Sequence, residues 1–369
     1  MNKKLRRYVG ICAGYFFLMM AITFGTAGAF ASDCPQARAQ GGGNAGDHCQ
    51  ADNPNAQCRD RAYLINPCGP WIGASANNYP GTGTSLVARI TNMEQRTGRQ
   101  MSLVHAYNSV GDNVLTDEEL YFVNRPDTHL LLNWKPTGKW ANAAGGNDAV
   151  NAGIDQMALS IKAVAPKKIF LSVFHEPQND VSANNPGDTC QLAGGGGAGT
   201  PADYVNMWHN VRARFDALGV DNVVWIPIFQ SYAPLNCLIP KLYPGDAYVN
   251  WVGFDMYDNG KGWDADVSAI YNYLNSLGYS NKPYMITEWG IAGARPQSEA
   301  YKFYDDIKAS IDANKYPNLK GYVVWDSKGA KFYQVGYGGP GPVSNPANYY
   351  PDLVEQEHFN NLAHDPHLQ

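Results

Sequence analysis

The sequence predicts an α/β fold, a (β/α)8 TIM barrel that follows a cysteine-containing N-terminal extension. From about Tyr63, short apolar runs alternate with segments of helical periodicity, the pattern of repeated strand–helix units. Most of the apolar runs are nearly continuous, as expected for parallel strands covered on both faces. Eight such runs are present, which is the strand count of one barrel.

Residues 1–31 have the pattern of a signal peptide. Four basic residues precede an apolar stretch from Tyr8 to about Phe30, and Ala29-Phe30-Ala31 matches a cleavage site. We therefore expect a secreted, extracellular protein, with periplasmic or cell-surface placement as variants. The apolar stretch is about long enough to span a bilayer, so an uncleaved membrane anchor is the alternative.

Residues 32–62 are rich in Gly, Ala, Asn and Gln and are expected to form an irregular extension before a barrel domain at 63–369. Six cysteines remain after the signal peptide, and an even number in an exported chain suggests disulfides. Cys190 and Cys237 fall in the loops after the fourth and fifth strands. We expect them to form a disulfide that holds the Gly-rich loop between the fourth strand and its helix.

The candidate strands are, in chain order, Trp71–Ala76, Met101–Ala106, Thr128–Trp134, Lys168–Phe174, Val223–Phe229, Val249–Asp255, Tyr284–Glu288 and Gly321–Trp325. The candidate helices between and after them are Ser85–Arg96, Asp117–Asn124, Ala149–Val164, Ala202–Leu218, Ala265–Leu277, Ser298–Ala313 and Leu353–Ala363, with at best a short helix in Asn236–Tyr243. An open doubly wound sheet is disfavoured, because no Gly-rich phosphate-binding turn follows the first strand.

The charge balance indicates the class of partner. The sequence has 28 basic and 33 acidic residues, and removal of the four basic residues of the signal peptide changes the net charge from −5 to −9. Nucleic acids and polyanionic polysaccharides are poor partners for such a chain, whereas a neutral glycan is suitable. We expect a monomer.

Two glutamates, Glu176 and Glu288, end the fourth and seventh candidate strands. A carboxylate at the C-terminal end of a buried parallel strand is costly, and that end of a barrel carries the active site. Two carboxyl groups about 5 Å apart cleave glycosidic bonds with retention of configuration, and their proximity separates their pKa values. The alternative for either glutamate alone is a helix cap or a partner for a nearby arginine.

Three segments resemble glycoside hydrolase family 26, the clan A barrels that include the β-mannanases. His175-Glu176 is similar to that family's acid/base signature, and 282–290 (KPYMITEWG) is similar to its nucleophile strand. Residues 244–257 (PGDAYVNWVGFDMY) are similar to its sixth strand. The resemblance spans roughly residues 63–365.

The resemblance implies that Glu176 is the general acid/base and Glu288 the nucleophile. It implies that His175 hydrogen-bonds to the sugar or to the nucleophile, and that Tyr257 orients Glu288. Trp325 would be the platform beneath the sugar at the cleavage point, because aromatic faces stack on the apolar faces of pyranose rings.

Three further residues are expected to contact substrate. Trp134 would form a second aromatic wall. Gln178 would stand in for an asparagine that the family has after the acid. His105 ends the second strand and is either in the site or a core histidine. No aromatic residue follows Glu176 within Pro177–Val181, where the family has a sugar-stacking side chain, and the family's arginine before His175 is also missing.

Together these features predict a secreted endo-acting retaining β-glycosidase on a neutral polysaccharide, with β-1,4-mannan as the first choice. β-1,3-Xylan and mixed-linkage β-glucan remain alternatives, as does a carbohydrate-binding protein that has lost catalysis. The mechanism needs no metal and no organic cofactor, and no residues have convincing metal-ligand spacing.

Overall fold

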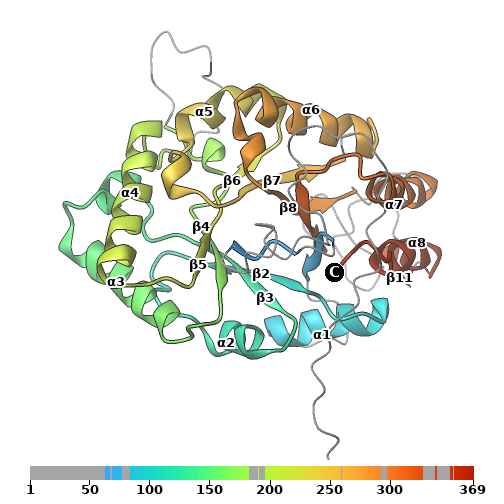
Figure 1. Ribbon diagram of the computed structural model, residues 1–369, viewed down its shortest axis with the longest axis horizontal. Coiled ribbons are helices and arrows are strands. Elements are labelled where there is room, and N and C mark those ends of the chain that lie inside the picture. Colours follow the sequence, from blue (N-terminus) through green and yellow to red (C-terminus); the bar gives the residue numbers. More distant parts are fainter. Residues whose placement is uncertain are drawn as a thin grey trace, which may run out of the picture. The chain divides into compact units, whose positions relative to one another are not determined.

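A computed structural model describes residues 63–66, 69–76, 84–182, 190, 196–258, 260–291, 297–326, 337–338, 350–351 and 353–369. The predicted boundaries at residues 31 and 62, and the four cysteines between residues 34 and 68, lie outside this set. No helix among these residues has the length and apolar character needed to cross a membrane. They form a ring of strands surrounded by helices (Figure 1).

The predicted parallel barrel is present. The order of its strands is β5-β4-β3-β2-β1-β9-β8-β7-β6, and every neighbouring pair is parallel. The strands are β1 (Trp71–Ser75), β2 (Leu103–Asn108), β3 (His129–Trp134), β4 (Ile169–Val173), β5 (Val223–Trp225), β6 (Ile228–Gln230), β7 (Val252–Tyr257), β8 (Tyr284–Gly290) and β9 (Leu319–Trp325). Two short strands outside the barrel, β10 (Tyr337–Gly338) and β11 (Tyr350–Pro351), pair antiparallel.

The fifth barrel strand is interrupted, where the sequence predicted one continuous strand. β5 and β6 are separated by Ile226 and Pro227, because proline has no N–H to donate to a neighbouring strand. The backbone still bonds on both sides: Ile226 N–H donates to the Leu171 carbonyl, and the Pro227 carbonyl accepts from Gly253 N–H. Since β5 pairs with β4 and β6 pairs with β7, this segment closes the ring.

All the predicted helices are present, with ends that differ by at most two residues from the predicted ones. They are α1 (Leu86–Thr97), α2 (Asp117–Asn124), α3 (Asp148–Lys162), α4 (Pro201–Ala217), α6 (Trp263–Ser276), α7 (Gln297–Asp312) and α8 (Leu353–Ala363), with the short α5 (Ile239–Leu242) in the segment expected to hold little helix. Side-chain caps fix several of the starts. Ser85 caps α1, and Thr116 and Thr200 form capping boxes at α2 and α4.

Alternation along the strands separates two cores. Leu103, Leu131, Phe170 and Met285 pack together in an inner cluster that fills the barrel. Neighbours of opposite parity, such as Leu130 and Leu132, belong to the larger cluster between strands and helices. The inner positions at the C-terminal ends of the strands are therefore those that face the expected active site.

Cys190 and Cys237 are joined by a disulfide, as predicted. Cys237 lies in a 3₁₀ turn (Ala233–Leu238) that follows β6. The bond therefore ties the segment after β4 to the segment after β6 at the same end of the barrel.

Candidate active site

Glu176 follows β4 on a sharply turning backbone. Phe174 and Glu176 have φ angles of 61° and 48°, in the left-handed region that few non-glycine residues adopt. The Glu176 N–H donates to the Ile228 carbonyl at 2.9 Å, which fixes this turn to β6. Such conformations persist where the surrounding contacts impose them, and they concentrate at functional sites.

Glu288 reaches the site because β8 contains a bulge. Ile286 and Glu288 pair with adjacent residues of β7, so Thr287 is an extra residue on β8. Simple alternation would place Glu288 with Ile286 in the outer core. The bulge instead lets Thr287 bond to Asp255 and lets Glu288 lie beside it in the site, while Trp289 returns to the outer core.

His175 brings the two glutamates together. Its Nε2 lies 3.5 Å from Glu288 Oε1 and 4.0 Å from Glu176 Oε2. These two carboxylate oxygens are therefore no farther apart than the sum of the two distances. This excludes a separation of about 10 Å or more and is compatible with the pair about 5 Å apart that retaining glycosidases use.

Two tyrosines hold the Glu288 carboxylate. The Tyr107 hydroxyl donates to Oε1 and the Tyr257 hydroxyl donates to Oε2, each at 2.6 Å. Burial, together with the negative charge of Glu288, raises the pKa of both tyrosines well above the usual value, so both stay protonated. Each oxygen of Glu288 thus accepts a hydrogen bond, which fixes its orientation and favours its ionised form.

His105 contacts the Tyr107 hydroxyl. The imidazole is fully buried, and its Nδ1 lies 2.9 Å from the Tyr107 oxygen and 3.1 Å from the Thr287 carbonyl oxygen. Burial lowers the pKa of His105 to about 4, so the ring is neutral at neutral pH. Because the Tyr107 proton is donated to Glu288, Nδ1 carries the imidazole proton and donates it. His105 therefore acts on Glu288 through Tyr107.

The two glutamates have opposite pKa shifts. Burial raises the pKa of Glu176, and the Glu288 charge adds to this rise while His175 opposes it. Burial would also raise the pKa of Glu288, but bonding to His175 and Tyr107 and the nearby imidazoles outweigh it and hold the pKa at about 2. One carboxyl group is therefore biased toward the protonated form and the other is ionised.

Asp255 is a third carboxyl group in the site. Its Oδ1 accepts from the Thr287 hydroxyl at 2.6 Å, and its Oδ2 lies 3.9 Å from His175 Nε2. Burial and the charges of Glu288 and Glu176 raise the pKa of Asp255 well above its usual value. Donor atoms of His175, Asp255 and Glu288 lie within 4.8 Å of one another, as in a metal site. Hydrogen bonds already occupy three of the four carboxylate oxygens, so we assign this group to the hydrogen-bond network.

Trp325 lies next to this network. It ends β9, is partly exposed, and its ring packs edge-on against Tyr107, with 5.5 Å between ring centroids. Tyr107, which is not among the residues expected from the sequence, is 38% exposed as a whole, although its hydroxyl is held between Glu288 and His105. The alternation of side chains along β2 indicates its position. Leu103, His105 and Tyr107 share the inner face of this strand, so Tyr107 is the inner residue nearest the C-terminal end.

The expectation that Trp134 forms an aromatic wall is wrong. Its side chain is fully buried and belongs to the outer core, together with Leu130 and Leu132 of the same strand. The period of two along β3 places all three on the helix-facing side. Trp134 therefore offers no face to a sugar.

The expectation that Gln178 binds substrate is also wrong. Gln178 is fully buried, and its amide exchanges two hydrogen bonds with the backbone of Gln230, at 3.1 and 3.3 Å. The next residue, Asn179, lies beside Glu176: its amide donates to Glu176 Oε2 at 2.9 Å, and its oxygen accepts from the Gln230 side chain. The turn after β4 thus directs Asn179 to Glu176 and Gln178 into the protein.

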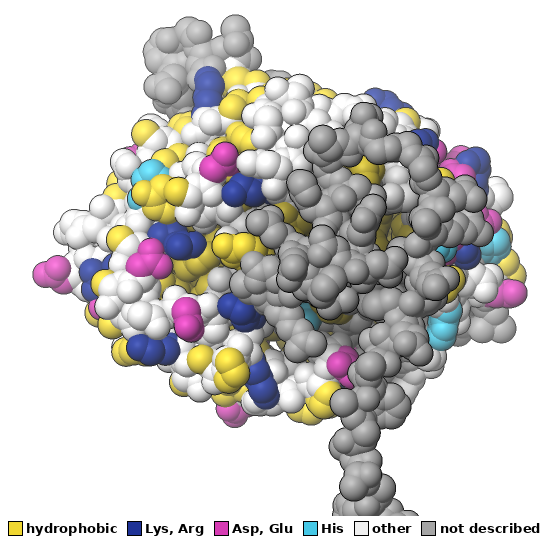
Figure 2. All heavy atoms as spheres, in the orientation of Figure 1, with side chains coloured by type: hydrophobic (Ala, Val, Ile, Leu, Met, Phe, Trp, Pro, Cys, Tyr) yellow, Lys and Arg dark blue, Asp and Glu magenta, His cyan; other side chains and the backbone are white. Residues whose placement is uncertain are grey.

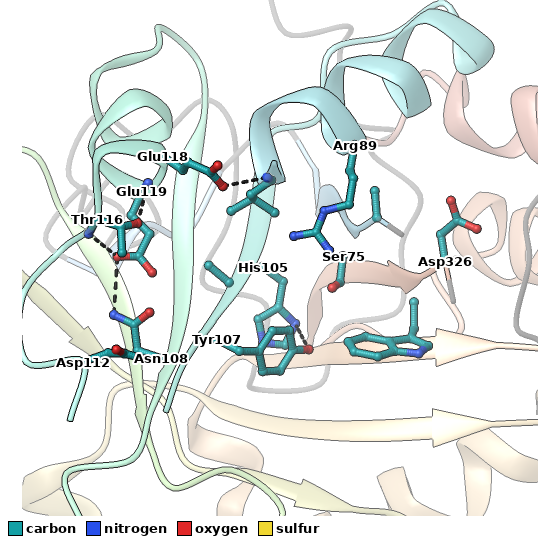
Figure 3. Close-up of a pocket in the computed structure, with 14 residues that line it drawn as sticks. Ser75, Arg89, His105, Tyr107, Asn108, Asp112, Thr116, Glu118, Glu119 and Asp326 are labelled. Carbon is teal, nitrogen blue, oxygen red and sulfur yellow. Dashed lines mark hydrogen bonds between the residues drawn. The ribbon is translucent and has the colours of Figure 1, made fainter. Parts of the chain in front are cut away.

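A cavity of about 480 Å³ opens beside this network (Figure 3). Tyr107 and Trp325 line it on the side of the glutamates, and Arg89 and Glu118 line it on the side of α1 and α2. Its size is within the range of about 300–1,000 Å³ that is usual for small-ligand sites. The network around Glu288 therefore borders a space that can hold a small ligand.

Comparison with known proteins agrees with the resemblance. The model of glycosyl hydrolase family 26 matches residues 139–320. Endoglucanase H of Acetivibrio thermocellus is 25% identical in an alignment 263 residues long, which covers 66% of this chain and 26% of that protein. The chain thus spans about a quarter of the length of this relative.

Solved structures share the fold. The catalytic domain of a Bacillus sp. JAMB-750 endo-β-1,4-mannanase superposes with a TM-score of 0.59 at 14% identity, covering 85% of this chain and 89% of that domain. A modular endo-β-1,4-mannanase from Cellulomonas fimi gives a TM-score of 0.57 at 18% identity, covering 84% and 74%. The family model and these barrels lead to the same conclusion. Residues 139–320 match glycosyl hydrolase family 26, and the shared barrel fold supports membership of that family.

Proposed function

We propose that the protein is an endo-acting β-glycosidase that hydrolyses a neutral polysaccharide with retention of configuration. In this proposal Glu176 is the acid/base and Glu288 is the nucleophile. The main support is the opposite pKa shift of two carboxyl groups that both lie beside His175. A protonated and an ionised carboxyl group side by side are what double displacement needs at neutral pH.

In the first step Glu288 attacks the anomeric carbon while Glu176 gives its proton to the glycosidic oxygen. The bond between that carbon and oxygen breaks, and an ester joins the sugar to Glu288. Glu176, now ionised, then takes a proton from water as the water oxygen attacks the same carbon and releases Glu288. Tyr107 and Tyr257 keep the Glu288 carboxylate oriented before the attack and after the release.

Trp325 provides the aromatic platform for the sugar at the cleavage point, with part of its ring exposed beside Tyr107. His175 lies within reach of both carboxyl groups and of a sugar hydroxyl between them. It therefore fixes the position of the sugar relative to the nucleophile. These residues supply the positioning part of the rate enhancement.

We propose β-1,4-mannan as the substrate. The two solved family structures described above are endo-β-1,4-mannanases by name. The net charge of −5 disfavours polyanionic chains. On the face shown in Figure 2, the described Lys and Arg side chains are interspersed with Asp and Glu and form no extended basic patch there.

A β-glucan is the second candidate. Endoglucanase H, named for action on glucan, matches 66% of this chain. The segment Pro177–Val181 after the acid lacks the aromatic residue that the resemblance to mannanases led us to expect. β-1,3-Xylan is the third candidate substrate.

We also propose that the protein is exported, with residues 1–31 as signal peptide, 32–62 as extension and 63–369 as catalytic domain. The disulfide between Cys190 and Cys237 supports export, since such bonds form and persist in oxidising compartments.

The test is a product analysis on β-1,4-mannan, mixed-linkage β-glucan and β-1,3-xylan. We expect oligosaccharides of several lengths from mannan, with the β-anomer formed first in proton NMR spectra. An α-anomer formed first would exclude the double displacement. Binding without turnover would support a carbohydrate-binding protein instead. Glu176→Gln and Glu288→Gln should both lose activity, whereas the exposed Glu357 provides the matched control, Glu357→Gln.

A further inference from the structure

We propose that Arg89 is a specificity residue that binds the second sugar on the glycone side of the cleaved bond. This sugar would lie in the cavity bordered by Tyr107 and Trp325 (Figure 3). The inference rests on the proposed function and adds to it a residue outside the catalytic network.

The residues that line the cavity indicate whether it receives the glycone or the leaving part of the substrate. Tyr107 both lines the cavity and donates to the proposed nucleophile, Glu288. Neither Glu176 nor Glu288 lines it directly, but Tyr107, which does, bonds to Glu288 and not to the proposed acid. Because the acid gives its proton to the leaving sugar, the leaving sugar lies beside Glu176. The cavity, which lies on the other side of Tyr107, therefore receives the part of the polysaccharide that stays attached to the nucleophile.

The guanidinium of Arg89 is directed at this space (Figure 3). It is partly buried on α1, and only its Nε bonds within the described chain, to the Ser85 carbonyl at 3.4 Å. Its two terminal nitrogens have no hydrogen-bond acceptor among the described residues. Figure 3 shows its guanidinium pointing into the cavity near Ser75. Burial lowers the pKa of Arg89, which reflects a cation partly removed from water. Such a group is stabilised by acceptors that a ligand supplies.

The carboxylates around the cavity are held by other partners. Glu118 Oε2 accepts from the Leu86 N–H at 2.6 Å, and Asp326 pairs with Arg96 at 3.0 Å. Neither carboxylate forms an ion pair with Arg89, but their negative charge makes the cavity unfavourable for an acidic sugar. Arg89 is therefore suited to the hydroxyl oxygens of a neutral sugar.

Two aryl glycosides separate this role from catalysis. An aryl β-mannoside places one sugar on the glycone side, and an aryl β-mannobioside places two. In Arg89→Met we expect kcat/KM to fall roughly 10- to 100-fold for the mannobioside, as for loss of a charged hydrogen bond. The fall should come mainly from a higher KM. The kcat/KM for the mannoside should not change. Arg89→Lys keeps the positive charge but not the planar guanidinium, so its kcat/KM for the mannobioside should lie between those of the wild type and Arg89→Met.

An equal loss on both glycosides, or no loss on either, would overturn the assignment of Arg89. If the wild-type protein cleaves neither glycoside, the proposed function fails, and calorimetric titration with mannobiose tests the cavity separately. Weaker binding by Arg89→Met would then support the subsite, and equal binding would overturn it. Circular dichroism melting of each variant identifies a loss caused by unfolding.

Discussion

The hydrogen bond from Tyr107 to Glu288 gives a measurable prediction. In Tyr107→Phe the ring stays but its hydroxyl, 2.6 Å from Glu288 Oε1, is removed. This hydroxyl is one of the groups that hold the pKa of Glu288 at about 2. Its loss should raise that pKa, because the ionised form loses a donor.

The size of the shift follows from the strength of the bond. A hydrogen bond to a charged group contributes about 1.5–3 kcal/mol. One pKa unit corresponds to about 1.4 kcal/mol, so the pKa of Glu288 should rise by about one to two units. Only the ionised carboxylate attacks, so activity is lost as pH falls through this pKa. A raised pKa moves the loss to higher pH, to about pH 3–4.

The assay is the pH dependence of kcat/KM, which reports ionisations of the free enzyme. Tyr257→Phe is the matched variant, since Tyr257 donates to the other oxygen of Glu288 at the same distance. Both variants should move the acidic limb in the same direction, with far-UV circular dichroism showing that the fold persists at each pH. An acidic limb unchanged in both would refute the assignment of Glu288 as the group held ionised by these tyrosines.

Three further predictions concern the neighbouring elements. Glu176→Gln should remove the alkaline limb of the pH profile, since activity otherwise falls as Glu176 loses its proton. Its turnover of mannan should drop about 10²- to 10⁴-fold, with less loss for substrates whose leaving group needs no proton; equal losses would contradict the acid role. Gln178→Ala should cost about 1–3 kcal/mol in denaturant unfolding by breaking both bonds to the Gln230 backbone, and a raised KM in folded protein would instead restore a substrate role. Replacing Cys190 and Cys237 by serine should cost about 4 kcal/mol for the 47-residue separation, and a loss under about 1 kcal/mol would show that the bond constrains little.

The barrel was predictable because its strands and helices have clear periodicities. Nearly continuous apolar runs marked the buried parallel strands, and caps such as Thr116 marked helix starts. The break at Pro227 could also have been inferred, since proline cannot donate within a central strand. The sequence therefore carried nearly all of the architecture.

Alternation along the strands also bears on the residues of the site. It places Tyr107 on the inner face with His105, and it places Trp134 on the outer face with Leu132. Both assignments follow from the period of two and needed no coordinates. Tyr107 could have been found, and Trp134 rejected, by this argument.

Other features of the site depend on local backbone geometry that periodicity does not encode. The bulge at Thr287 reverses the side expected for Glu288. The left-handed conformations after β4 decide that Asn179 reaches Glu176 while Gln178 turns inward. Such positions are imposed by tertiary contacts, so the sequence alone indicated the two glutamates as the candidate pair but not the residues that support them.

The most direct measurement of the catalytic assignment is to trap the covalent intermediate. A 2-deoxy-2-fluoro-β-mannobiosyl fluoride slows both steps, while its good leaving group lets the first proceed, so an ester should accumulate on the nucleophile. Peptide mass mapping after inactivation should find one glycosyl adduct, on Glu288, and none in Glu288→Gln. An adduct on another side chain, or rapid hydrolysis of mannan by Glu288→Gln, would contradict the account.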